Sequence, residues 1–191
     1  MRSIKLSMIL AMCACGGSSP GSVDGTVHGM TVPIGDVISS SATGRGTAAG
    51  AHFAVIEMST TSNLCADAVD PPIEHPRQQV VLLEMFDVNG TTLNTPTVPG
   101  TYAIFQGTGT PPAKSAVFAV KAIDAACKDI PTSDAKATTG TVTLASVSGN
   151  VFTGSFDVAL DSGDHVTGSF EPEACPAIQA AIDSTATPTC R

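Results

Sequence analysis

The sequence has no tryptophan, one tyrosine and few charged side chains. Charged residues make up 14% of the 191 positions, about half the share that is usual in a globular domain. Sites that bind glycans usually present aromatic platforms, so the shortage of aromatic residues argues against such a site. The low charge indicates an exported protein rather than a cytosolic one.

Basic side chains are scarcer than acidic ones. Nine lysines and arginines stand against 17 aspartates and glutamates, which gives a formal net charge of −8. Such a chain repels nucleic-acid phosphates and anionic lipids, and it contains no basic cluster to offset the repulsion. We therefore predict that nucleic acid is not a partner.

Long hydrophobic runs are also missing. A transmembrane helix needs about 20 apolar residues, and no segment reaches that length. At the N-terminus, Arg2 and Lys5 precede a short apolar run at residues 6–12, and small residues follow. This pattern is typical of a signal peptide, which we place at residues 1–14.

The residues Ala14, Cys15 and Gly16 resemble the lipobox of bacterial lipoproteins, in which a peptidase cuts before a cysteine that carries a diacylglycerol. The resemblance implies that Cys15 is the lipidation site. Inner-membrane lipoproteins often have Asp after that cysteine, so Gly16 implies the outer membrane. The alternative is an ordinary secretory signal that is cut between Ala14 and Ser19, which would leave a secreted or periplasmic protein.

Within this interpretation, the lipidated Cys15 and a flexible tether occupy residues 15–21, and one domain follows at residues 22–191. The whole pattern resembles small cell-envelope lipoproteins of Gram-negative bacteria that lack an assigned activity. The resemblance is specific only over residues 1–20. It implies membrane attachment through the lipid and assigns no catalytic residue.

Four cysteines follow the anchor: Cys65, Cys127, Cys175 and Cys190. An even number in an exported chain predicts two disulfides, and four cysteines allow three pairings. We expect Cys175 to pair with Cys190 across a short loop, which leaves Cys65 with Cys127. The spacings match no zinc motif.

The hydrophobic pattern predicts a mostly β domain. From Phe152 to Leu160, apolar and polar residues alternate, which is typical of a strand with one buried face. Residues 141–147 and 165–170 flank this segment across turns and complete an antiparallel meander. Further strands are expected at the following ranges: 51–58, 79–86, 102–106 and 116–122.

Other segments have turn, loop or helix signals. Residues 39–50 and 59–78 are expected to form loops, and Asn89-Gly90 predicts a tight hairpin turn. Residues 176–183 predict a short helix that begins at a proline. The expected fold is all-β, an antiparallel β-sandwich or small barrel with a short C-terminal helix.

No motif for a nucleophile elbow or a phosphate-binding loop is present. We therefore predict no cofactor, no catalytic residue and no metal ligand set. Dispersed residues leave an alternative open. Four histidines with Met30 or Met58 could hold a metal, and acidic turns at 87–90 and 161–164 could bind calcium. Acidic residues on the strands could hydrolyse a glycoside. The histidines and strand acids concerned are His28, His52, His75, His165, Glu57, Glu84 and Asp157.

The sequence thus favours a non-enzymatic envelope protein that binds a partner or ligand through loops such as residues 59–78 and 107–114. A metal-binding or hydrolytic sandwich built from dispersed residues is the competing hypothesis. Whether the protein is an enzyme stays open at this point.

Overall fold

The computed structural model describes residues 20–191. The predicted signal peptide and the lipidation site Cys15 lie outside the described residues. Two short 3₁₀ turns are present at Gly46–Ala48 and Pro131–Ser133. The helices and strands are β1 (Gly21–Gly25), β2 (Asp36–Thr43), β3 (His52–Ser59), α1 (Leu64–Asp67), β4 (Ile73–Glu74), β5 (Gln79–Asn89), β6 (Thr92–Asn94), β7 (Gly100–Ile104), β8 (Lys114–Ala122), β9 (Ala135–Ser148), β10 (Val151–Leu160), β11 (His165–Phe170), β12 (Glu173–Ala174), α2 (Ile178–Asp183) and β13 (Thr189–Cys190).

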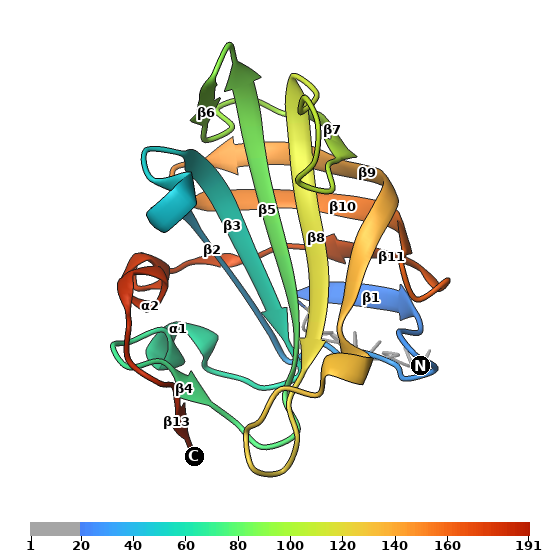
Figure 1. The fold of residues 1–191 in the computed structure, drawn as a ribbon, viewed down its shortest axis with the longest axis vertical. Coiled ribbons are helices and arrows are strands. Elements are labelled where there is room, and N and C mark those ends of the chain that lie inside the picture. The colour runs from blue at the N-terminus through green and yellow to red at the C-terminus, as the bar shows by residue number, and fades with distance from the viewer. Residues whose placement is uncertain (1–19) are drawn as a thin grey trace, which may run out of the picture.

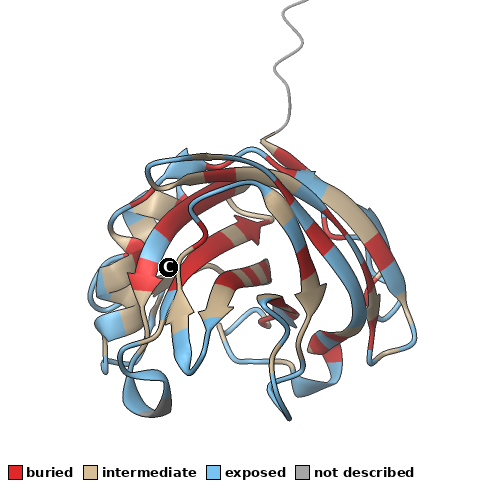
Figure 2. Cartoon of the chain, turned by 90° about the horizontal axis from the view of Figure 1, so that it is seen from above, coloured by how far each residue is buried: buried red, intermediate tan, exposed pale blue. Residues whose placement is uncertain are grey.

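One large sheet dominates the fold. Its strands follow the order β1-β11-β10-β9-β7-β8-β5-β3-β2-β12, and β6 pairs with β5. The sheet curls into a half-barrel, so that β1, β10 and β11 lie behind β3, β5 and β8 (Figures 1 and 2). The long strand β9 pairs with β10, β7 and β8 and so belongs to both halves. The mostly β architecture predicted from the sequence is confirmed.

The sheet is mixed rather than purely antiparallel. Strands β7 and β8 run parallel, as do β12 and β2, and the small sheet of β4 and β13 is parallel too. The architecture is therefore one continuous curled sheet. It confirms the all-β part of the expected fold, but not the antiparallel β-sandwich or small barrel. The meander β9-β10-β11 and the helix α2 are confirmed.

The inner core fills the space between the two halves of the curl. Alternate residues of β5, namely Val81, Leu83 and Met85, are fully buried in it. From the opposite half, Phe156 on β10 meets Phe118 on β8, with ring centroids 5.0 Å apart. The other residues of β5, such as Leu82 and Phe86, face outward into a second cluster. Because both faces of β5 are covered, its sequence from Val80 to Phe86 is apolar except for Glu84.

Two phenylalanines of the inner core lie opposite glycines on the neighbouring strand. Phe156 is in register with Gly168, and Phe170 is in register with Gly154. A β-carbon at Gly168 would overlap the Phe156 ring and the Ser22 carbonyl oxygen, and one at Gly154 would overlap the Phe170 ring. These glycines therefore leave the room that the two aromatic rings occupy.

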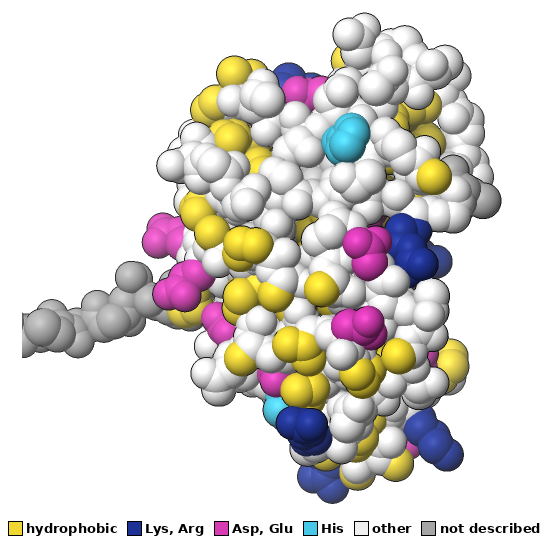
Figure 3. Space-filling model, turned by 90° about the vertical axis from the view of Figure 1, so that its left-hand side faces the viewer, with side chains coloured by type: hydrophobic (Ala, Val, Ile, Leu, Met, Phe, Trp, Pro, Cys, Tyr) yellow, Lys and Arg dark blue, Asp and Glu magenta, His cyan; other side chains and the backbone are white. Residues whose placement is uncertain are grey.

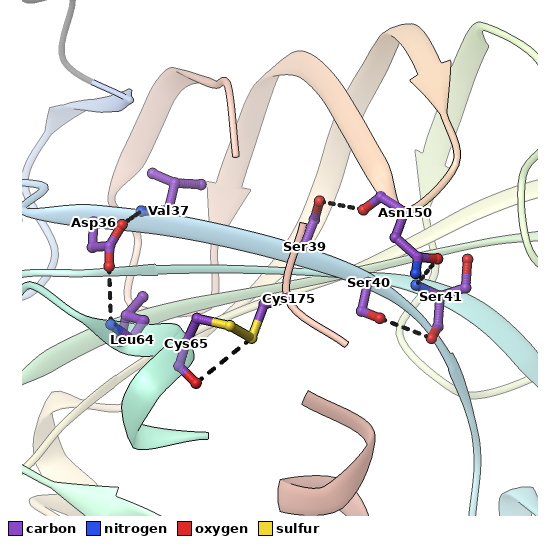
Figure 4. Close-up of a disulfide and its surroundings, with 9 residues drawn as sticks. All are labelled: Asp36, Val37, Ser39, Ser40, Ser41, Leu64, Cys65, Asn150 and Cys175. Carbon is purple, nitrogen blue, oxygen red and sulfur yellow. Dashed lines mark hydrogen bonds between the residues drawn. A yellow bond between two sulfur atoms is a disulfide. The ribbon is translucent and has the colours of Figure 1, made fainter. Parts of the chain in front are cut away.

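Hydrogen bonds link the edge strand β2 to the opposite half of the sheet. Ser39 Oγ donates to the Asn150 carbonyl oxygen at 2.7 Å, and the Ser41 amide donates to Asn150 Oδ1 at 3.3 Å (Figure 4). Asn150 lies in the turn between β9 and β10. The predicted loop at residues 39–50 is therefore wrong at its start, because residues 39–43 belong to β2.

The hairpin after β5 differs in detail from the prediction. Asn89 pairs with Thr92, so Gly90 and Thr91 form the turn, and of these residues only Gly90 has a positive φ, of 62°. The hairpin turn predicted at Asn89 and Gly90 therefore lies one residue further along the chain, at Gly90 and Thr91. Residues 59–78, expected as a loop, also contain α1 and β4.

Candidate functional site

The outer face of β2, β3 and β5 is covered by two segments, residues 60–78 and 175–190, which we call the cover. The cover contains α1, β4, α2 and β13 and lies at the lower left of Figure 1. Leu64, Ala68 and Ile178 of the cover pack with Phe53 and Val55 of β3 in the second apolar cluster. The sheet is therefore buried on both faces in this region.

Both disulfides fasten the cover. Cys65 of α1 bonds to Cys175, and Cys127 bonds to Cys190 of β13, with Cα atoms 5.5 and 5.6 Å apart. The predicted pairing of Cys175 with Cys190 and of Cys65 with Cys127 is therefore wrong. Helix α2 and the residues after it carry Cys190 away from Cys175 to the strand pair β4–β13, beside the loop that holds Cys127. Two disulfides are typical of proteins exported to an oxidising compartment.

Polar contacts fix the position of the cover against the sheet. Asp36 of β2 accepts a hydrogen bond from the Leu64 amide at 2.9 Å with one carboxylate oxygen, and from the Val37 amide at 2.8 Å with the other (Figure 4). The buried Gln78 donates to Ser59 Oγ at 3.0 Å and accepts from the His75 amide at 3.0 Å. These bonds set the height of the cover above β3.

A cavity of about 300 Å³ lies between the sheet and the cover. Its floor is the outer face of β3, β5 and β8, and its walls come from α1, the residues around β4, the end of α2 and Ile123. Most of the lining is apolar. The apolar lining residues are Leu64, Ala68, Pro72, Ile73, Val80, Leu82, Ala119, Ile123 and Ala181.

Glu57 is the acidic residue of the cavity floor. On the sheet it lies between Ile38 of β2 and Leu82 of β5. The side chain keeps partial access to solvent, yet the loss of hydration in this environment raises the pKa of its carboxyl to about 7, and the charges of Asp36 and Asp67 raise it further in the same direction. Both observations agree with a carboxyl that faces the cavity.

Within the part of the chain that the structure describes, the Glu57 carboxyl has no hydrogen-bond or ion-pair partner. Among residues 20–191, no side chain or backbone group donates a hydrogen bond to the Glu57 carboxyl, and no basic side chain forms an ion pair with it. Its oxygen atoms reach solvent, since among residues 20–191 the only buried side-chain nitrogen or oxygen without a partner is Asp134 Oδ1. A carboxyl that lines the cavity without a protein donor can accept hydrogen bonds from a ligand, and this marks the cavity as a candidate site.

Asp67 lies on the cover and also lines the cavity. Its Oδ2 atom is 2.8 Å from Nε2 of His75, and the Asp67 side chain is only 15% exposed. Nδ1 of His75 is 3.2 Å from the Arg191 carbonyl oxygen. The pair therefore joins α1 to the C-terminal end of the chain and holds one acidic group beside the cavity.

The cavity rim carries charges of both signs. Glu74, Lys121 and Asp129 line it, and Lys121 and Asp129 are exposed. Burial and the nearby Asp129 raise the pKa of Glu74, while Lys121 lowers it. Figure 3 shows the molecule from this side, with acidic side chains among hydrophobic ones.

The other strand acids named in the sequence analysis are not gathered with Glu57 around the cavity. Glu84 is on the outer face of β5, in register with Val55 and Val117, and burial raises the pKa of its carboxyl, but it does not line the cavity. Asp157 is exposed on β10, where it lies 2.8 Å from Nε2 of His165.

The histidines and the acidic turns are dispersed as well. Met58 is buried in the inner core, and His52 is exposed beside Thr43. In the turns, Asp164 accepts hydrogen bonds from the His28 amide and from Ser162 Oγ, and Asp87 contacts Tyr102 and Lys114. Over residues 20–191, no three side chains of His, Cys, Asp or Glu come together in a way that could hold a metal ion.

Of the two loops expected to bind a partner, residues 59–78 form part of the cover, whereas no residue of 107–114 lines the cavity. Within the described part of the chain, every helix is too short or too polar to cross a membrane. Comparisons with protein-family models, with curated proteins and with solved structures find no match to this chain.

Proposed function

We propose that this protein is a ligand-binding module of the cell envelope that holds a small organic molecule in the cavity beneath the cover. The observation that carries the proposal is the unpartnered Glu57 carboxyl within mostly apolar walls. Small-molecule sites combine apolar walls with a few polar groups that orient the ligand, in volumes of about 300–1,000 Å³. The cavity falls at the lower end of that range.

The proposed role is binding. Among the described residues, those that line the cavity include no serine, threonine, cysteine or histidine, which are common nucleophiles, and the carboxylates of the lining can orient a ligand. A single orienting carboxyl is enough for recognition of a ligand.

The location follows from the N-terminal sequence. Cys15 is lipidated, residues 1–14 are then removed by cleavage before it, and the lipid holds the domain at the outer membrane. The lipobox-like residues Ala14, Cys15 and Gly16 support this proposal, and the two disulfides support an exported, oxidising environment.

Indole probes test the binding function, because the chain has no tryptophan and its own fluorescence does not mask them. The neutral probe tryptophol is titrated with the purified full chain, and fluorescence polarisation is measured. We expect saturable binding that Ala119→Phe weakens at least tenfold, since the new ring fills the cavity floor.

Ala126→Phe is the matched control, because Ala126 is exposed in a loop outside the cavity. It should bind tryptophol like the unchanged protein. If Ala119→Phe and the unchanged protein give the same titration curves, the cavity is not the binding site and the proposal fails.

A further inference from the structure

We propose that the ligand of this cavity is an organic monocation, a protonated amine on an apolar body, whose ammonium group contacts the Glu57 carboxylate. The inference rests on the proposed function and adds the charge of the ligand to it. It follows from the position of Glu57, from the charges around it and from the walls of the cavity.

The position of Glu57 leaves its carboxyl oxygens available to a ligand. The residue lines the cavity floor, and no group of residues 20–191 donates a hydrogen bond to it. An ammonium group has several N–H donors and no acceptor, and a carboxylate has only acceptors, so the two complement one another. A hydroxyl could donate one bond, but it would leave the charge unbalanced.

The neighbouring charges favour a cation at the same place. Asp36 and Asp67 oppose a negative charge on Glu57, so by the same Coulombic interaction they attract a positive one. Both acids are held in place, Asp36 by the Leu64 amide and Asp67 by His75. Of the two, Asp67 lines the cavity, and neither carboxylate can move away from Glu57 without breaking these contacts.

The remaining charged groups do not supply a counter-ion to Glu57. Lys121 is exposed at the rim, where it acts on Glu74 beside Asp129. Glu84, on the neighbouring strand, adds another acid to the same face of the sheet. The lining thus contains four acids, one lysine and the amide of Gln78. The other lining residues are apolar and suit the hydrocarbon part of an amine.

Binding of a cation is coupled to ionisation of Glu57. With a pKa of about 7, this carboxyl is largely ionised at pH 8 and largely neutral at pH 6. Since the ammonium group prefers the ionised form, its affinity should fall about tenfold between pH 8 and pH 6.

Three probes with one indole ring and different charges test the inference. They are tryptamine, a cation; tryptophol, which is neutral; and indole-3-propionate, an anion. A primary amine stays protonated from pH 6 to pH 8, so only the protein titrates. At pH 8 we expect the unchanged full chain to bind tryptamine at least tenfold more tightly than tryptophol, and indole-3-propionate most weakly.

Two variants locate the effect. Glu57→Gln should remove the preference for tryptamine and its pH dependence, while tryptophol still binds. Glu84→Gln is the matched control, because this acid is on the same face of the sheet but outside the cavity. It should change the preference less than threefold. Binding of tryptophol should differ little between pH 6 and pH 8 in all three proteins.

The outcomes separate this inference from the proposed function. If tryptamine and tryptophol bind equally and Ala119→Phe weakens both, the cavity binds ligands but the choice of a cation is wrong. If Glu57→Gln keeps the preference for tryptamine, Glu57 is not the recognition group and the inference is wrong. If no probe shows binding that Ala119→Phe reduces, both the inference and the proposed function fail.

Discussion

Glu57 is an ionisable residue in a strand whose other residues are nearly all apolar, and this placement has a consequence for stability. Its folded-state pKa of about 7 lies above the ordinary value of 4.5. Between these two pH values the unfolded chain binds fewer protons than the folded one, so stability falls as the pH rises through this window. The loss is complete above about pH 7.

The first prediction follows from this sign. Glu57→Gln should leave the free energy of unfolding nearly unchanged at pH 5 and increase it at pH 8 by about 2 kcal/mol. This energy follows from the rise in the pKa of Glu57 and is reduced because the side chain is partly exposed to solvent. Urea denaturation at both pH values measures the difference. Glu171 is an exposed acid, so Glu171→Gln should not increase the free energy of unfolding at pH 8. If Glu57→Gln and the unchanged protein are equally stable at pH 8, the Glu57 carboxyl is not in an environment that raises its pKa.

The second prediction concerns Gly168. Gly168→Ala should lower the free energy of unfolding by about 3 kcal/mol, because the new methyl group overlaps the Phe156 ring and the Ser22 carbonyl oxygen. Ser169→Ala, on the exposed side of the same strand, should change it by less than about 0.5 kcal/mol. If Gly168→Ala lowers the free energy of unfolding only slightly, β11 can move away from its neighbours β10 and β1 at little cost.

At the scale of elements, the disulfides determine how firmly the cover is held. Replacing Cys65 and Cys175 by alanine should lower the free energy of unfolding by about 4 kcal/mol, since the bond closes a loop of 110 residues. The same change at Cys127 and Cys190, with a separation of 63 residues, should have a somewhat smaller effect.

Hydrogen exchange adds a local measurement to this third prediction. Amides of the cover, such as that of Leu64, should exchange faster without the Cys65–Cys175 bond. Those in the meander β9-β10-β11 should change little in the folded state, because they are bonded within the large sheet. Uniformly faster exchange would show that cover and sheet open together.

Elements with one wet face were predictable from the sequence. In β10, Phe156 and Val158 are buried while Ser155 and Asp157 are exposed, so the period of two is visible in the residue types. Strand β2 gave no such signal, because two of its buried residues, Ser39 and Ser40, are polar and satisfied by hydrogen bonds. Ser39, for example, bonds to Asn150.

The disulfide pairing and the cavity could not be predicted for a related reason. They depend on where α2 and β13 place residues that are distant in sequence, and no local pattern encodes that placement. The position of Glu57 within an apolar strand was the one available signal of the cavity, but Glu84 and Asp157 also lie on strands. The sequence alone offered no reason to prefer it over Glu84.

At the scale of the whole molecule, the lipid anchor that we propose at Cys15 predicts where the protein is found. Cys15→Ser should abolish acylation and move the protein from the membrane fraction to the soluble one, since a serine hydroxyl cannot accept the lipid through a thioether. Fractionation with an immunoblot measures this. Cys65→Ser, which leaves the anchor intact, should stay with the membranes, and unchanged fractionation of Cys15→Ser would rule out the anchor.

The positions of the two disulfide bonds also determine when the protein acquires its complete ligand-binding cavity. Cys190 attaches the C-terminal segment of the cover to the loop that contains Cys127, and this disulfide forms only under oxidising conditions. A newly made chain inside a reducing cell would therefore lack the complete cover. Under the proposed function, amines of the cell interior would not be bound, and the ligand-binding form would arise only after export.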